Sequence, residues 1–164
     1  MLEYLLCFRI SVLFAYQAEK SKNKFIFLLF SLISILFPVI LAALRDYSIG
    51  VDTSHYLRGT WSMAVKRTDS LSRFLTTYLR VSAKDEIVYA WFLWIIAKIS
   101  NGSNRIFLFA TQLVIVGGVY IGAFRLKHHA NPAFTMLIFY LLYYHHSLNI
   151  TRQYMAMSII FGGG

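Results

Sequence analysis

The chain has 164 residues, of which 58% are hydrophobic, 17% are aromatic and only 14% are charged. Ordinary soluble domains are about half apolar and about one quarter charged, so this composition excludes that class and indicates a membrane protein. The net charge of +9 comes from basic residues in the gaps between apolar runs, which form no continuous basic stripe. Lipid headgroups and phosphates are therefore favoured as partners, and nucleic acid is not. Cys7, the single cysteine of the sequence, can build neither a disulfide framework nor a zinc site.

Apolar runs recur along the chain and predict an all-α, multi-spanning helical bundle in a membrane. A straight crossing takes about 20 apolar residues. The first run lacks a convincing cleavage site, so we interpret it as an uncleaved span and not as a signal peptide. The predicted spans cover residues 1–18, 25–44, 106–124 and 133–148, and 149–164 begins a further span.

Three of these runs carry features that predict how they pack. Pro38 in the second run predicts a kink that neighbouring helices must accommodate. Gly118-x-x-x-Gly122 in the third run offers a small-residue face for close helix packing. The fourth run ends in a polar aromatic cluster that is typical of a membrane–water boundary. This cluster consists of Tyr140, Tyr143, Tyr144, His145 and His146.

The segment 45–86 follows the second span and is expected to be an extracytoplasmic loop. It contains seven basic and five acidic residues. The basic excess fits either adhesion to anionic lipid or a funnel for an anionic, lipid-linked substrate. Apolar residues recur within the loop at helical spacing, which predicts an amphipathic helix lying on the membrane. They are Leu71, Phe74, Leu75, Tyr78 and Leu79.

Residues 87–100 are rich in Trp but too few for a straight crossing, so they suit a re-entrant or interfacial segment. The lysines in residues 20–24 place the first short loop in the cytoplasm by the positive-inside rule. If 87–100 crossed fully, the basic cluster at 125–129 would lie outside, against this rule. A re-entrant segment keeps the cluster inside and puts Arg45 and Arg152 on the same outer face, so we prefer this topology.

Polar residues interrupt the apolar sequence at two places. The stretch ALRDYSIGVDTSHY follows the second span and contains Arg45, with Gly50 five residues later, where it permits a tight turn. A lone arginine at the end of a span usually snorkels to the interface. The stretch SLNITRQ lies near the end of the chain, and its spacing predicts Asn149 and Arg152 on one helical face.

Together, LRDYSIGVDTSHY and SLNITRQYMAMSI resemble the paired signatures of the EpsG branch of the Wzy-like polysaccharide polymerases. The resemblance follows the order of elements over residues 1–164 and includes Asp85-Glu86 before the Trp-rich segment. The chain departs from the family pattern at Val51, where Thr is common, and at Ile87-Val88, where Pro-Gly is common. The resemblance implies a glycosyltransferase of the bacterial cytoplasmic membrane. Such enzymes lengthen exopolysaccharide, capsule or O-antigen chains on a polyprenyl pyrophosphate carrier.

The resemblance also implies the roles of individual residues. Guanidinium forks at Arg45 and Arg152 are expected to hold the donor pyrophosphate, so no metal or other cofactor is required. The nucleophile is a sugar hydroxyl of a second lipid-linked repeat unit, and its general base is Asp52 or, as second candidate, His55. Trp61 is interpreted as a sugar-stacking residue or an interfacial anchor, and the anchor is the commoner role. The other substrate-binding candidates are Gly50, Tyr56, Asn149 and Gln153.

Alternative functions remain at this stage. A transporter needs ionisable residues at mid-membrane depth, and only Arg9 fits, which argues against that class. An O-antigen-ligase-like transferase and a non-enzymatic partner of other polysaccharide-biosynthesis membrane proteins both stay open. Adjacent histidines at 128–129 and 145–146 point to different helix faces, so no metal site is expected. The sequence stops at Phe161-Gly-Gly-Gly within an expected span, which predicts the amino-terminal half of a polymerase, inactive alone.

Overall fold

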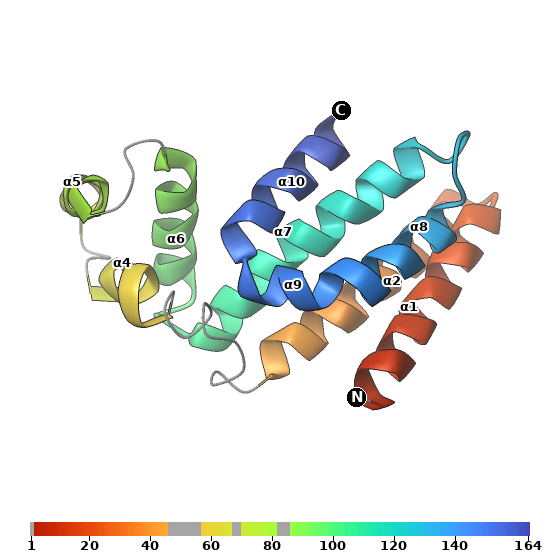
Figure 1. Ribbon diagram of the computed structural model, residues 1–164, viewed down its shortest axis with the longest axis horizontal. Helices are drawn as coiled ribbons and strands as arrows, with labels where there is room; N and C mark the ends of the chain where they lie inside the picture. Colours follow the sequence, from red (N-terminus) through yellow and green to blue (C-terminus); the bar gives the residue numbers. More distant parts are fainter. Residues whose placement is uncertain (1, 46–56, 67–69, 82–85) are drawn as a thin grey trace.

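The computed structural model describes residues 2–45, 57–66, 70–81 and 86–164, and within these ranges the chain is helical, without a β-strand (Figure 1). The all-α class predicted from the sequence is confirmed. Two of the helical elements, η1 and η2, are single π-helical turns. The elements are α1 (Leu2–Lys20), α2 (Lys24–Leu44), η1 (Leu57–Trp61), α4 (Ser62–Lys66), α5 (Leu71–Val81), α6 (Ile87–Ile99), α7 (Asn104–Arg125), α8 (Pro132–Ile138), η2 (Phe139–Tyr143), α9 (Tyr144–Asn149) and α10 (Thr151–Gly163).

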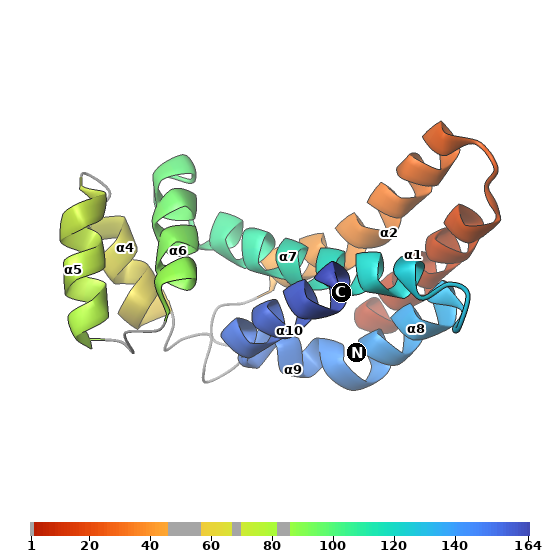
Figure 2. The ribbon, with the colours of Figure 1, turned by 90° about the horizontal axis from the view of Figure 1, so that it is seen from above.

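The main bundle contains α1, α2, α7, the helical run α8–η2–α9, and α10 (Figures 1 and 2). Helices α1 and α2 are antiparallel, and the ring centres of Phe14 and Phe30 are 5.6 Å apart. Helices α2 and α7 are also antiparallel. The Tyr120 hydroxyl lies 2.8 Å from Ser31 Oγ, and one turn further along, the ring centres of Phe124 and Phe27 are 5.5 Å apart. The chain therefore reverses direction at the short turn between α1 and α2, whereas α2 and α7 are neighbours in space that a longer part of the chain connects.

Pro38 lies inside α2 and removes one backbone donor from the helix. The carbonyl that loses its donor belongs to Ser34, four residues earlier. Ser11 on α1 replaces the missing donor, because its hydroxyl donates to the Ser34 carbonyl oxygen at 2.6 Å. The Ser34 hydroxyl in turn donates to the Ser11 carbonyl oxygen at 2.8 Å. The neighbouring helix thus accommodates the proline, as predicted.

The glycines of α7 allow α10 to approach closely. A Cβ atom at Gly118 would lie 2.6 Å from the carbonyl oxygen of Ser158, which a real side chain cannot tolerate. A Cβ atom at Gly122 would lie 2.2 Å from the Phe161 ring. A Cβ atom at Gly162 of α10 would in turn lie 2.7 Å from the carbonyl oxygen of Gly118. The predicted small-residue packing face is confirmed, and α10 is the helix that packs on it.

The predicted fourth span is helical as α8, η2 and α9, but its aromatic cluster does not form a boundary belt. Tyr140 and Tyr144 are buried in the bundle, whereas Tyr143, His145 and His146 are exposed. The Tyr140 hydroxyl lies 2.7 Å from Ser11 Oγ. The Tyr144 hydroxyl donates to the Pro38 carbonyl oxygen at 2.5 Å. The belt prediction is wrong for these two tyrosines, because their hydroxyls find partners on α1 and α2.

A second hydrophobic cluster joins η1, α4, α5 and α6 beside the main bundle (Figure 2). The amphipathic helix predicted in the loop is α5, and its Phe74 and Tyr78 side chains are fully buried in this cluster. The centre of its apolar face is therefore covered by protein, which corrects the prediction that the helix lies on the membrane. Trp61 is buried too, and its indole N–H donates to Asn104 Oδ1 at 2.7 Å. It is available neither for sugar stacking nor as an interfacial anchor.

Two helices in the described ranges, α2 and α7, are long and apolar enough to cross a membrane. They have 21 and 22 residues, and at about 1.5 Å per residue each matches the hydrocarbon thickness of about 30 Å. Large apolar side chains on α2, such as Phe25 and Leu28, are exposed on the outside of the bundle. Exposed apolar surface of this kind is suited to lipid.

Both basic turns lie at one end of the bundle, namely the turn between α1 and α2 and the turn between α7 and α8 (Figure 1). Asn131, in the second turn, donates through Nδ2 to Glu19 Oε2 at 3.0 Å. Helix α2 ends and α7 begins at the opposite end, so the chain between them leaves and re-enters the bundle there. The 13 residues of α6 belong to this intervening part.

Candidate functional site

Arg45 directly follows α2 and is only 8% exposed. Its Nη2 donates to the Leu148 carbonyl oxygen in the last turn of α9, at 2.9 Å. Desolvation lowers the pKa of the Arg45 guanidinium below its ordinary value, and the neighbouring Tyr4 and Tyr144 partly offset this effect. Arg45 is therefore buried among the helices and does not extend away from them. Its side chain joins the two polar stretches that the sequence analysis identified, across 103 residues of chain.

The helix breaks at Ile150, which has φ −94° and ψ 55°. In a continuous helix the Leu148 carbonyl would accept the backbone N–H of Arg152, and here it accepts the Arg45 side chain instead. Asn149 consequently ends α9, while Arg152 lies in the first turn of α10. The prediction that Asn149 and Arg152 share one face of a single helix is wrong, because the helix is interrupted between them, where the Leu148 carbonyl oxygen accepts the Arg45 side chain.

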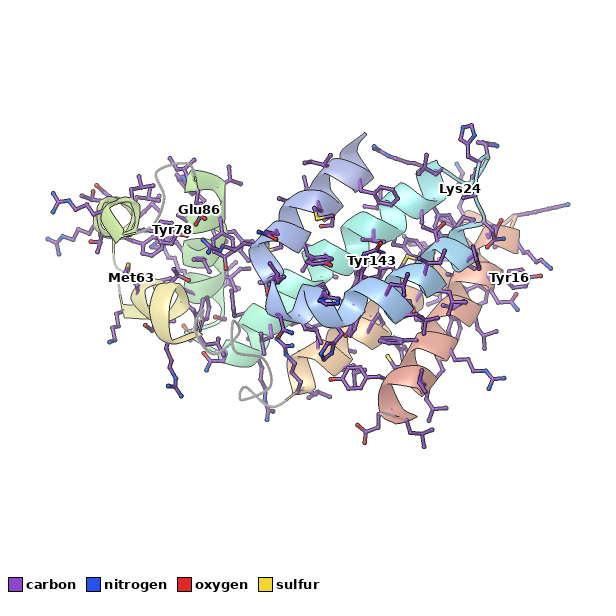
Figure 3. All side chains as sticks on the ribbon, in the orientation of Figure 1. Tyr16, Lys24, Met63, Tyr78, Glu86 and Tyr143 are labelled. Atoms are coloured by element: carbon purple, nitrogen blue, oxygen red, sulfur yellow. The ribbon has the colours of Figure 1, made fainter. Side chains whose placement is uncertain are left out.

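Arg152 forms an ion pair with Glu86, the residue that precedes α6. Its Nη1 lies 2.5 Å from both carboxylate oxygens of Glu86. The Tyr78 hydroxyl of α5 donates to Glu86 Oε2 at 2.8 Å, and Figure 3 shows these two side chains next to each other. The Arg152 guanidinium also lies over the Tyr89 ring, 5.9 Å from its centre. Both charged side chains are partly accessible, with 35% exposure for Arg152 and 29% for Glu86.

A cavity of about 440 Å³ lies beside this ion pair, between α6 and α10. Its polar residues, Glu86, Arg152 and Gln153, lie at the beginnings of the two helices. Aliphatic and aromatic side chains form the rest of the wall. They are Val88, Tyr89, Phe92, Val114, Met155, Ala156 and Ile159. A ligand that combines an anionic group with an apolar tail matches this distribution.

Half of the predicted site residues lie outside the residues that the structure describes, namely Gly50, Asp52, His55 and Tyr56. Their roles stay predictions. Of the others, Asn149 is half-buried and Gln153 is exposed in the wall of the cavity. Within the described ranges, no three His, Cys, Asp or Glu side chains are grouped so that they could hold a metal ion.

The model of the EpsG family matches residues 28–163. The chain belongs to the EpsG family. The predicted resemblance is therefore confirmed, and the matched region contains Arg45, Glu86 and Arg152. No curated protein and no solved structure shows significant similarity to the chain. Membership of the EpsG family, together with the two apolar helices, makes this a membrane protein and associates it with polysaccharide biosynthesis.

The candidate site includes two residues, Glu86 and Tyr78, to which the sequence alone assigned no role. In the sequence, Glu86 is the second residue of an acidic pair before an apolar helix, and Tyr78 is one member of an apolar helical face. The available signal was the hydroxyl of Tyr78, because a tyrosine on a buried face usually needs a hydrogen-bond partner. Its partner is the carboxylate of Glu86, eight residues later.

Proposed function

We propose that this EpsG-family protein is a multi-pass protein of the bacterial cytoplasmic membrane that joins polyprenyl-pyrophosphate-linked repeat units into polysaccharide. The observation that carries the proposal is the accessible guanidinium of Arg152 at a largely apolar cavity, in a chain of this family. A lipid-linked donor presents a pyrophosphate next to an isoprenoid tail. An arginine beside apolar side chains complements both parts of such a molecule.

The proposed reaction is a glycosyl transfer on the outer face of the membrane. A hydroxyl of the acceptor attacks the anomeric carbon of the donor sugar, and the bond from that carbon to the pyrophosphate oxygen breaks. The hydroxyl proton passes to a base, for which Asp52 and His55 are the candidates. Polyprenyl pyrophosphate leaves with added negative charge, which the guanidinium of Arg152 stabilises.

Arg45 has a second role in this proposal. Its hydrogen bond to the Leu148 carbonyl oxygen fixes the break between α9 and α10, and thereby the direction in which Arg152 points. It also brings a second positive charge to the segment that carries Arg152. Gly50, Tyr56, Asn149 and Gln153 complete the proposed substrate contacts.

The first prediction concerns Arg152. A hydrogen bond to a charged group contributes about 1.5 to 3 kcal/mol, so Arg152→Ala should reduce transfer by about 10-fold to 100-fold. Arg152→Lys should restore little of this loss, because an ammonium group lacks the two parallel N–H donors of guanidinium. The measurement is the length distribution of polysaccharide made in a polymerase-deficient bacterial strain that expresses the complete gene.

Arg105→Ala serves as the control, because Arg105 is an exposed arginine at the beginning of α7 and does not line the cavity. It should leave the polysaccharide unchanged. Long chains of normal length from Arg152→Ala would contradict the proposed role of the guanidinium. Transfer of single pre-assembled chains to a lipid acceptor, without elongation, would assign the protein to ligase-like transferases instead.

A further inference from the structure

We propose that the cavity between α6 and α10 binds the isoprenoid pyrophosphate of the donor, and that Glu86 occupies Arg152 until the pyrophosphate replaces it. The inference rests on the proposed function for the identity of the substrate. It adds the position of the carrier. It also explains how Glu86 keeps other anions away from Arg152 before the carrier binds. Glu86 acts in this scheme as a built-in competitor of the ligand.

The cavity has the shape and composition that such a carrier requires. Its volume is about 440 Å³, and its charged groups lie at one end of α6 and α10. Val88 and Ile159 line the cavity and are also exposed on the outside of the protein. An isoprenoid tail can therefore extend from the cavity into lipid, while its pyrophosphate stays at Arg152.

The ion pair between Glu86 and Arg152 can be exchanged because it is not buried. About one third of each side chain is accessible, and exposed ion pairs contribute little net stability. A pyrophosphate offers more charge and more acceptor oxygens to a guanidinium than a carboxylate does. Exchange on Arg152 therefore favours the ligand.

Glu86 keeps other partners after the exchange. The hydroxyl of Tyr78 donates to its Oε2 at 2.8 Å, and Tyr78 itself is held in the buried cluster of α5 and α6. Glu86 also precedes the first turn of α6, where the helix dipole favours a negative charge. The carboxylate is thus not left without a donor when the pyrophosphate takes Arg152.

A second cavity in the main bundle provides a comparison. It has a volume of about 260 Å³ between α7, η2 and α10, and no charged side chain lines it. Its wall includes Val119, Phe139 and Phe161. Apolar space alone gives no preference for an anion, so the position of Arg152 and Glu86 selects the cavity between α6 and α10.

The experiment measures binding of farnesyl pyrophosphate, a short isoprenoid pyrophosphate, to the purified full-length protein in lipid nanodiscs. Inorganic pyrophosphate and farnesol are measured in parallel, because they carry only the head or only the tail. Farnesyl pyrophosphate should bind at least about tenfold more tightly than either. Equal affinity for farnesyl and inorganic pyrophosphate would overturn the apolar part of the site.

Glu86→Gln tests the exchange. Removing the competing carboxylate should tighten farnesyl pyrophosphate binding by up to about fivefold, the range set by an exposed ion pair. If Glu86 only positions Arg152, the same substitution should weaken binding. Glu3→Gln is the control for net charge, because Glu3 is an exposed acidic residue on α1. Unchanged or weaker binding by Glu86→Gln would overturn the inference.

Tyr78→Phe gives an independent test that keeps the ring and the carboxylate. Without the hydroxyl, Glu86 loses a donor that would remain after exchange, so it should hold Arg152 more firmly. Binding should weaken by a few fold, opposite in sign to Glu86→Gln. If both substitutions changed the affinity for farnesyl pyrophosphate in the same direction, the exchange would be contradicted. These measurements need no polymerisation, so the site can fail while the proposed function stands, or the reverse.

Discussion

Single residues decide how the helices meet, and Pro38 is the clearest case. An unpaired carbonyl among apolar side chains costs several kcal/mol in a membrane. Ser11 on α1 therefore has a defined structural role, because it donates to the carbonyl that Pro38 leaves without its helical N–H. The hydroxyl of Tyr140 shares the same serine. One polar cluster thus ties α1, α2 and η2 together at the position of the proline.

A double-mutant cycle tests whether Ser11 acts through the Ser34 carbonyl. Ser11→Ala should destabilise the protein by about 1 to 3 kcal/mol, because the Ser34 carbonyl loses its donor. In a Pro38→Ala background, residue 38 again supplies a backbone N–H to that carbonyl, so the same change should cost about 1 kcal/mol less. The measurement is the unfolding free energy in detergent micelles for the four variants.

Ser31→Ala is the matched control for this cycle. Ser31 is also a buried serine of α2, but its hydroxyl donates to the Phe27 carbonyl oxygen and not to Ser34. Its effect should add to that of Pro38→Ala without coupling. A cycle for Ser11 with no coupling energy would show that the serine does not act through the carbonyl opposite Pro38.

At the scale of elements, the contact between α7 and α10 sets the position of the candidate site. Gly118 and Gly162 face each other, so the two helix backbones are close together at this point. Arg152 lies in the first turn of the same α10. A change that pushes α10 away from α7 therefore moves the guanidinium and alters the cavity beside it.

Gly118→Ala and Gly117→Ala form a pair that separates helix propensity from packing. A Cβ atom at Gly117 meets nothing within 4 Å, so alanine there should stabilise α7 by up to about 1 kcal/mol. At Gly118 the same methyl group would lie 2.6 Å from a backbone oxygen of α10. Gly118→Ala should lower the thermal midpoint, and Gly117→Ala should not. Equal midpoints would contradict close packing at Gly118.

The sequence predicted the helices better than their contacts. The predicted spans 25–44 and 106–124 correspond to α2 and α7 within two residues at each end, because long apolar runs define their own limits. The faces of these helices were not predictable in the same way. In a run that is apolar on all sides, periodicity does not identify the buried side. Tyr144 is an example, since its partner is the carbonyl of Pro38, 106 residues away.

At the scale of the whole molecule, the candidate site lies where two hydrophobic clusters adjoin. Tyr89 and Phe92 of α6 pack against both clusters, and the cavity opens beside them. The two arginine motifs were recognisable in the sequence, but Glu86 pairs with Arg152 across 66 residues of chain. Spacing along the chain carries no information about such a pair. The pairing of Glu86 with Arg152 follows from the packing of α6 against the bundle.

The positions of the helix ends predict the orientation of the protein in the membrane. The turn after α1 contains Lys22 and the turn after α7 contains Lys127, and both lie at one end of the bundle (Figure 1). The beginning of α7, with Arg105, lies at the other end. Short basic turns favour the cytoplasm. Lys22 and Lys127 should therefore face the cytoplasm, while Arg105 should lie outside with the candidate site.

Single-cysteine labelling in intact cells tests this orientation. Cys7 is a free, buried cysteine. It is first replaced by serine (Cys7→Ser), so that each variant carries one cysteine. Arg105→Cys should react with a membrane-impermeant maleimide in intact cells, because the reagent reaches only the outer face. Lys22→Cys and Lys127→Cys should react only after permeabilisation, and this second treatment shows that each cysteine is reactive. Labelling of position 127 but not of position 22 in intact cells would place the two turns on opposite sides of the membrane. The helices between them would then cross the bilayer an odd number of times, which the antiparallel pair of α2 and α7 does not allow.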